Sequence, residues 1–125
     1  MRKRSLFLIT ILFSLLISSC KYDFILPTEV PPQTGPVLFA TQVAPIFSTG
    51  NKCTACHNTG GTAPDLTASK AYASIVPSLI NTATPASSLI YSFPAPTTTT
   101  HSWKKLTAGE AALILTWITE GAKNN

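Results

Sequence analysis

Two cysteines and a histidine form the most chemically suggestive group in this sequence. Cys53 and Cys56 are separated by two residues, and His57 follows the second cysteine directly. Two thiols at this spacing can form thioether bonds to both vinyl groups of one haem, and the adjacent imidazole can then bind the iron. The motif predicts one covalently bound haem c, with iron, attached through Cys53 and Cys56 and ligated by His57.

The same residues allow two other interpretations. Cys53 and Cys56 could form a dithiol redox pair, but no alternation of strands and helices surrounds them. They could also bind zinc together with His57 and His101. Adjacent Cys56 and His57 fit one tetrahedral site poorly, and the second pair of ligands lacks the spacing of a zinc finger. The sequence favours haem over both.

The N-terminus has the layout of a secretory signal. A basic start is followed by an apolar run over residues 6–17 and by Ile17-Ser18-Ser19-Cys20. The run is shorter than the roughly 20 apolar residues of a membrane-spanning helix. Its end resembles the lipobox of bacterial lipoproteins, in which the cysteine is acylated. We predict a signal peptide over residues 1–19 and lipidation of Cys20; an ordinary signal peptide and an uncleaved anchor are the alternatives.

Removal of this leader changes the charge of the chain. The formal net charge of +4 includes three basic residues of the leader, and the rest of the chain carries about +1. These charges form no basic cluster, so we expect no nucleic-acid binding. The three cysteines are then all assigned, one to lipid and two to haem.

The remaining chain has room for one small domain. Residues 20–37 contain four prolines without helical or strand periodicity, which is typical of an extended tether after a lipidated N-terminus. Residues 38–125 are predicted to form the folded domain. Apolar residues at helical spacing predict a first helix near residues 39–47, with a late start or a kink at Pro45.

Three further helices are predicted from their start and stop signals. One covers residues 67–76, with Thr67 as N-cap and Pro77 beyond its end. Another covers residues 84–91, with Thr84 as N-cap. The last begins at a capping box of Thr107 and Glu110 and ends at Gly121. Residues 93–103 between them are predicted to be a loop.

Several segments resemble small bacterial c-type cytochrome domains. The resemblance is to lipoprotein haem domains of Bacteroidetes and to planctomycete-type cytochrome c domains, and it extends over most of residues 38–125. The matching segments are Val43-Ala44-Pro45-Ile46-Phe47, Cys53-Thr54-Ala55-Cys56-His57, Ser88-Leu89-Ile90-Tyr91, Leu106-Thr107-Ala108-Gly109-Glu110 and the stretch from Trp117 to Asn125. The resemblance implies an all-α fold, a small cytochrome c-like helical domain around one covalently bound haem, with the first and last helices crossing beside it.

The resemblance also bears on the other iron ligand and on a proline. Family members commonly supply a methionine from the loop before the last helix, but the only methionine here is Met1. His101 lies in that loop, so we predict that it is the sixth ligand and that the potential lies below that of His/Met cytochromes. The alternatives are an open or water-bound site and ligation by Lys104, Lys105 or another donor. A different register sets Phe93-Pro94 where a Met-Pro would stand, which would make His101 incidental.

In such cytochromes a proline carbonyl after the haem histidine accepts a hydrogen bond from Nδ1, and this orients the ring. Pro64 is the candidate here; the alternative is an ordinary loop proline.

Together these features predict a single-haem electron carrier rather than an enzyme. Its partners would be redox proteins, and it would be tethered by lipid to a membrane of the bacterial cell envelope, facing the periplasm or the outer membrane. If the sixth site is open, the domain would instead bind small ligands as a sensor or a peroxidase-like enzyme. No acid–base pair or distal arginine lies near the motif to favour peroxidase chemistry.

Overall fold

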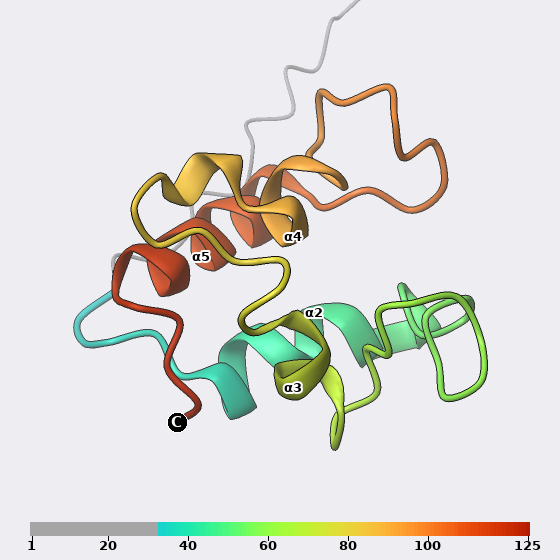
Figure 1. Cartoon of the computed structure of the whole chain (residues 1–125). Helices are drawn as coiled ribbons and strands as arrows, with labels where there is room; N and C mark the ends of the chain where they lie inside the picture. The colour runs from blue at the N-terminus through green and yellow to red at the C-terminus, as the bar shows by residue number, and fades with distance from the viewer. Residues whose placement is uncertain (1–32) are drawn as a thin grey trace, which may run out of the picture.

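The computed structural model describes residues 33–125, which form short helices joined by long loops (Figure 1). This range contains no strand, as predicted for an all-α domain. Its elements are a π-helical turn (Phe39–Val43), α2 (Ala44–Ser48), a 3₁₀ turn (Thr49–Asn51), α3 (Ala71–Ile75), a 3₁₀ turn (Pro85–Ser87), α4 (Leu89–Ser92) and α5 (Ala108–Thr119). The predicted signal peptide, Cys20 and most of the tether lie outside the described residues. Between residues 33 and 125, no helix is both long and apolar enough to cross a membrane.

The first helical segment forms in two parts, as Pro45 predicts. Proline is tolerated in the first turn of a helix, where its missing N–H has no intrahelical partner. Pro45 stands in the first turn of α2, and the residues before it form the π-helical turn. The four apolar residues of the predicted face are all buried: Phe39, Val43, Ile46 and Phe47. The predicted helical face is therefore confirmed.

Helix α5 begins and ends as its sequence predicts. The Thr107 hydroxyl accepts a hydrogen bond from the Glu110 N–H at 3.2 Å, and the Glu110 carboxylate accepts one from the Thr107 N–H at 2.7 Å. After Thr119 the chain reverses at Gly121, whose φ of +98° favours glycine. The Ala122 N–H then bonds to the Trp117 carbonyl at 2.9 Å. The capping box and the C-terminal glycine are both confirmed.

The helix predicted from Thr67 begins later, at Ala71. The Asp65 carboxylate accepts hydrogen bonds from both the N–H and the hydroxyl of Thr67, at 3.0 and 2.6 Å. Thr67 is therefore held in a turn and does not cap α3. The predicted stop is confirmed, since α3 ends at Ile75 and Val76 is extended before Pro77.

The helix predicted over residues 84–91 is divided in two by Ser88. This buried residue has an extended ψ of 128° and separates the 3₁₀ turn from α4. Its hydroxyl accepts a hydrogen bond from the Asn81 N–H at 2.9 Å and donates one to the Asn81 carbonyl at 3.3 Å. These bonds to a neighbouring loop replace the helical continuation.

An aromatic cluster joins the beginning, middle and end of the domain. The rings of Phe39 and Trp117 lie 5.2 Å apart between centroids, and the Tyr72 ring stands edge-on to both. The Tyr72 hydroxyl donates to the Ala122 carbonyl at 3.0 Å, and the Trp117 indole N–H donates to the Lys123 carbonyl at 2.9 Å. The core therefore satisfies the polar ends of its aromatic residues through the C-terminal tail.

Both chain ends of the domain are tied to this core. Val37 is fully buried, and its N–H donates to the Glu120 carboxylate at 2.7 Å. The Ala40 N–H donates to the Asn125 carbonyl at 2.9 Å, which agrees with the place of the C-terminus beside this segment in Figure 1. The packed domain thus includes Val37, a residue of the predicted tether.

Two loops project on the side of the molecule away from the C-terminus, drawn green and orange in Figure 1. We call them the motif loop (residues 53–66) and the histidine loop (residues 94–106). The Cys53 N–H donates to the Phe47 carbonyl at 2.9 Å, which ties the motif loop to α2. The Leu106 N–H donates to the Pro94 carbonyl at 2.9 Å, which closes the histidine loop at its base. The helices therefore hold both loops at their ends.

Candidate functional site

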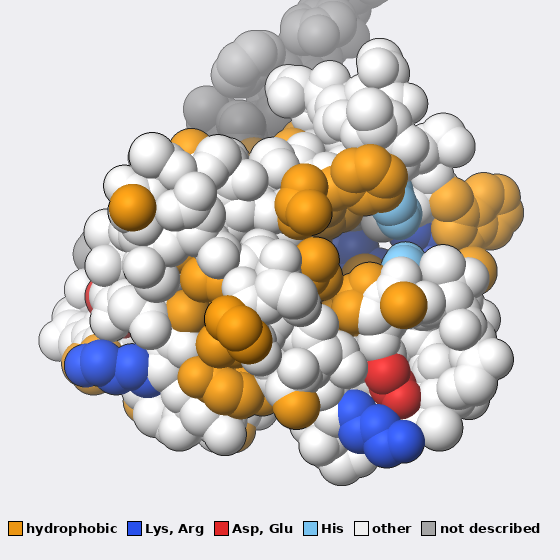
Figure 2. All heavy atoms as spheres, in the orientation of Figure 1, with side chains coloured by type: hydrophobic (Ala, Val, Ile, Leu, Met, Phe, Trp, Pro, Cys, Tyr) orange, Lys and Arg blue, Asp and Glu red, His pale blue; other side chains and the backbone are white. Residues whose placement is uncertain are grey.

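A cavity of about 370 Å³ lies between the motif loop and the histidine loop. All the residues predicted to hold haem line it: Cys53, Cys56, His57, Pro64 and His101. Most of the remaining wall is apolar and comes from Phe47, Leu66, Leu79, Leu89, Ile90, Phe93 and Leu106. Figure 2 shows this hollow with histidine side chains on both of its sides and hydrophobic side chains around it.

The two cysteines and His57 reach the cavity from one turn of backbone. The N–H groups of Cys56 and His57 both donate to the Cys53 carbonyl, at 3.1 and 2.9 Å. Cys53 is half-buried and Cys56 is exposed, and both are free thiols. Burial raises the pKa of the Cys53 thiol, and the positive charge of Lys52 offsets only part of that effect. The turn thus presents two thiols and an imidazole to one cavity.

The orientation of His57 is fixed by Thr62, and not by Pro64 as predicted. Nδ1 of His57 lies 3.1 Å from the Thr62 carbonyl oxygen, so an imidazole protonated at Nδ1 donates to it. This leaves Nε2 as the nitrogen that can bind a metal. Pro64 lines the cavity but does not accept this bond.

The path of the motif loop explains why Thr62 replaces Pro64. The Thr62 N–H donates to the Cys56 carbonyl at 2.9 Å, so the chain folds back over the motif immediately. A Cβ atom on Gly61 would lie 2.5 Å from that same carbonyl oxygen, so only glycine permits this close approach. The fold-back brings the Thr62 carbonyl to His57 before the chain reaches Pro64.

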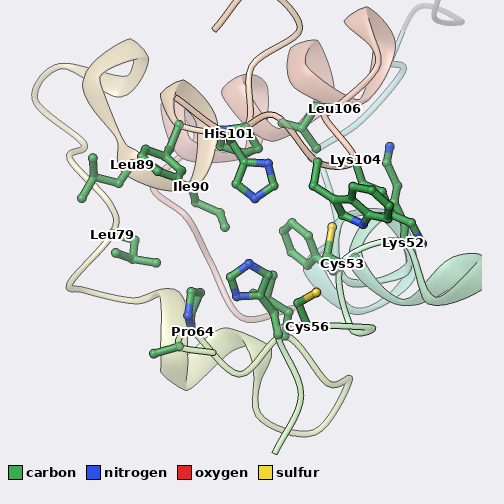
Figure 3. A pocket seen from close by; sticks show the side chains of 17 residues that line it. Lys52, Cys53, Cys56, Pro64, Leu79, Leu89, Ile90, His101, Lys104 and Leu106 are labelled. Atoms are coloured by element: carbon green, nitrogen blue, oxygen red, sulfur yellow. The ribbon is translucent and has the colours of Figure 1, made fainter. Parts of the chain in front are cut away.

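His101 reaches the cavity from the opposite loop. Figure 3 shows a ring nitrogen of His101 directed into the cavity, on the side facing the labelled cysteines. Its other nitrogen, Nδ1, is buried and has no hydrogen-bond partner within the described part of the chain. Because a buried atom cannot be the one that faces the cavity, the nitrogen directed there is Nε2.

The two imidazole rings face each other across the cavity. Their centroids lie 6.3 Å apart and their planes are 22° from parallel. Rings stacked in direct contact would lie about as close as two carbon atoms, roughly 3.5–4 Å. At 6.3 Å between centroids, His57 and His101 are therefore not in face-to-face contact.

The lysines of this region are engaged in other contacts. Lys52, next to the motif, forms an ion pair with Glu110 at the start of α5. Lys104 lines the cavity, but its ammonium group donates to the Asn51 carbonyl at 3.2 Å. The Lys105 ammonium donates to the Thr98 carbonyl within the histidine loop. These contacts favour His101 over Lys104 and Lys105 as a metal ligand.

The structure does not bring the cysteines and histidines together around a bare metal ion. Among residues 33–125, no three histidine, cysteine, aspartate or glutamate side chains are arranged to hold one. A zinc site needs about four such ligands, whereas a haem iron already has porphyrin donors and needs only axial ligands.

Comparison of the chain with protein-family models, with curated proteins and with solved structures finds no match.

The Lys52–Glu110 pair leads to a prediction about acid stability. Burial tends to raise the pKa of Glu110, but hydrogen bonds from Lys52 and Thr107 outweigh it and lower that pKa below its ordinary value of 4.5. A carboxyl group with a lowered pKa stabilises the fold above about pH 4.5, and this contribution is lost as the pH falls through the folded-state pKa.

We expect Glu110→Gln to lower the free energy of unfolding by roughly 1 kcal/mol at pH 7 and by less at pH 3. Urea unfolding at both pH values measures this difference, and other titrating carboxyl groups cancel between parent and variant. Equal losses at pH 3 and pH 7 would show that the charge of Glu110 contributes nothing.

Proposed function

We propose that this chain is a single-haem c-type cytochrome that carries electrons, with haem attached to Cys53 and Cys56 and iron held between His57 and His101. The observation that carries the proposal is the pair of facing imidazole rings, 6.3 Å apart. A metal–imidazole bond of roughly 2 Å on each side, with each nitrogen roughly 1 Å from its ring centre, requires about 6 Å. The two histidines therefore stand at the separation that one shared metal atom requires.

The walls of the cavity fit a large apolar group. Three large hydrophobic residues that line it are exposed: Leu89 at 53%, Phe93 at 47% and Trp103 at 69%. Exposed apolar side chains gathered around one hollow mark a binding site. The cavity volume also falls in the range typical of cofactor sites, about 300–1,000 Å³. A haem, which is broad, flat and mostly apolar, matches these walls.

Each residue of the site has a role in this proposal. The thiols of Cys53 and Cys56 would hold the haem by thioether bonds, so that it does not dissociate. His57, oriented by the Thr62 carbonyl, would be the proximal ligand, and His101 the second axial ligand. When bound, a haem supplies a reversible one-electron couple.

The lining of the cavity favours electron transfer over an enzymatic reaction. The described residues that line it include no aspartate or glutamate, so they offer no carboxylate to act as general base beside the histidines. With an imidazole on each side of the iron, no position would be left for a substrate. The lipid on Cys20 and the tether would hold this carrier at a membrane of the cell envelope, where it would meet redox partner proteins.

The first test of the proposal is covalent haem attachment. We expect the chain, produced with a c-type maturation system, to give a pyridine haemochrome spectrum and the mass of one added haem. The double variant Cys53→Ser, Cys56→Ser should lose the haem. Cys20→Ser should keep it, because the thioether bonds use only Cys53 and Cys56. A parent protein without covalent haem would sink the proposal.

The second test concerns His101. We expect the parent to be six-coordinate and low-spin and to bind carbon monoxide poorly. His101→Ala should become largely high-spin and bind carbon monoxide readily, because the second imidazole is removed. Ser102→Ala, in the same loop, serves as the control and should match the parent. If the absorption spectra of His101→Ala and the parent coincide, His101 is not the sixth ligand. The domain then has either another ligand or an open sixth site, and an open site would suit a sensor.

A further inference from the structure

The two histidine rings are held in the cavity by different kinds of contact. The ring of His57 is fixed by a hydrogen bond from Nδ1 to the Thr62 carbonyl. His101 has no such bond, because its Nδ1 is buried without a partner within residues 33–125. Metal-bound histidines are usually oriented by a hydrogen bond at the second ring nitrogen. Something else must therefore orient His101.

The His101 ring is in aromatic contact with Phe93. The Phe93 and His101 rings lie 5.6 Å apart between centroids with planes at 75°, an edge-to-face arrangement typical of aromatic pairs. Phe93 follows α4 directly, and its N–H donates to the Leu89 carbonyl at 3.1 Å. Ile90, about one helical turn before Phe93, is buried in the core. Phe93 is thus attached to a fixed helix, whereas His101 lies in a long loop.

We infer that Phe93 is the positioning residue of His101, and that its ring supplies by packing the orientation that the missing hydrogen bond would supply. The inference rests on the proposed function, in which His101 is an iron ligand. In this inference Phe93 does not stand in the place of a methionine ligand. It supports the ligand His101 instead. Without an aromatic ring at this position, His101 would leave the metal more often, and the His57 side would not change.

The experiment compares the haem-loaded parent with Phe93→Ala, Phe93→Tyr and Ser92→Ala. Ser92 is the control, because it lies in α4 directly before Phe93 and is not among the residues that line the cavity. The readout is the rate at which the reduced protein binds carbon monoxide, which departure of His101 limits. Thermal unfolding of the same samples reports any general loss of stability.

We expect the rate to rise about three- to tenfold in Phe93→Ala, the factor that corresponds to loss of one aromatic pair. Phe93→Tyr, which keeps the ring, and Ser92→Ala should both stay near the parent rate. A Phe93→Ala rate equal to that of the parent would overturn the inference, and so would an equal rise in Ser92→Ala.

A second readout separates this inference from the proposed function. In the haem-free protein, NMR relaxation of the His101 ring should show greater mobility in Phe93→Ala and no change in Ser92→Ala. A parent that lacks covalent haem would contradict the proposed function, yet this measurement would still decide whether Phe93 orients His101. Unchanged ring mobility in Phe93→Ala would refute the packing role.

Discussion

The separation of the two imidazole rings is set by helices to which neither histidine belongs. The aromatic cluster of Phe39, Tyr72 and Trp117 fixes the beginning and end of the domain against each other. From this core the motif loop is tied to the end of α2, and the histidine loop is closed where it leaves α4 and enters α5. The loops are irregular, but their ends are not free to move apart. The distance of 6.3 Å between the two ring centroids therefore depends on the packed core that holds the ends of both loops.

Much of the helical framework follows from local chemistry that is visible in the sequence. Thr107, Glu110 and Gly121 define α5 because a capping box and a left-handed glycine act within a few residues. The predictions fail where a side chain some residues away competes with the helix. Thr67 is drawn into a turn by Asp65, and Ser88 bonds to the Asn81 backbone instead of continuing a helix. Helical periodicity gives no sign of either competition.

The candidate site was predictable in its residue types but not in its supporting contacts. The spacing of Cys53, Cys56 and His57 identifies one side of the cavity, and the lack of a methionine in the loop leads to His101. Which carbonyl reaches His57 depends on the path that Gly61 permits, so the sequence pointed to Pro64 in place of Thr62. The contact of Phe93 with His101 joins a helix end to a loop, and no periodic pattern reports it. The result is an asymmetric pair, with one imidazole oriented by a hydrogen bond and the other by packing.

An iron held between the two histidines can be tested directly, because the chain has only two histidine residues in all. Pulsed EPR of the oxidised, haem-loaded protein labelled with ¹⁵N-histidine tests it most directly, since every labelled nitrogen belongs to His57 or His101. We predict that two labelled imidazoles couple to the low-spin iron of the parent, and that only His57 couples to the largely high-spin iron of His101→Ala. Coupling to a single labelled imidazole in the parent would contradict the account.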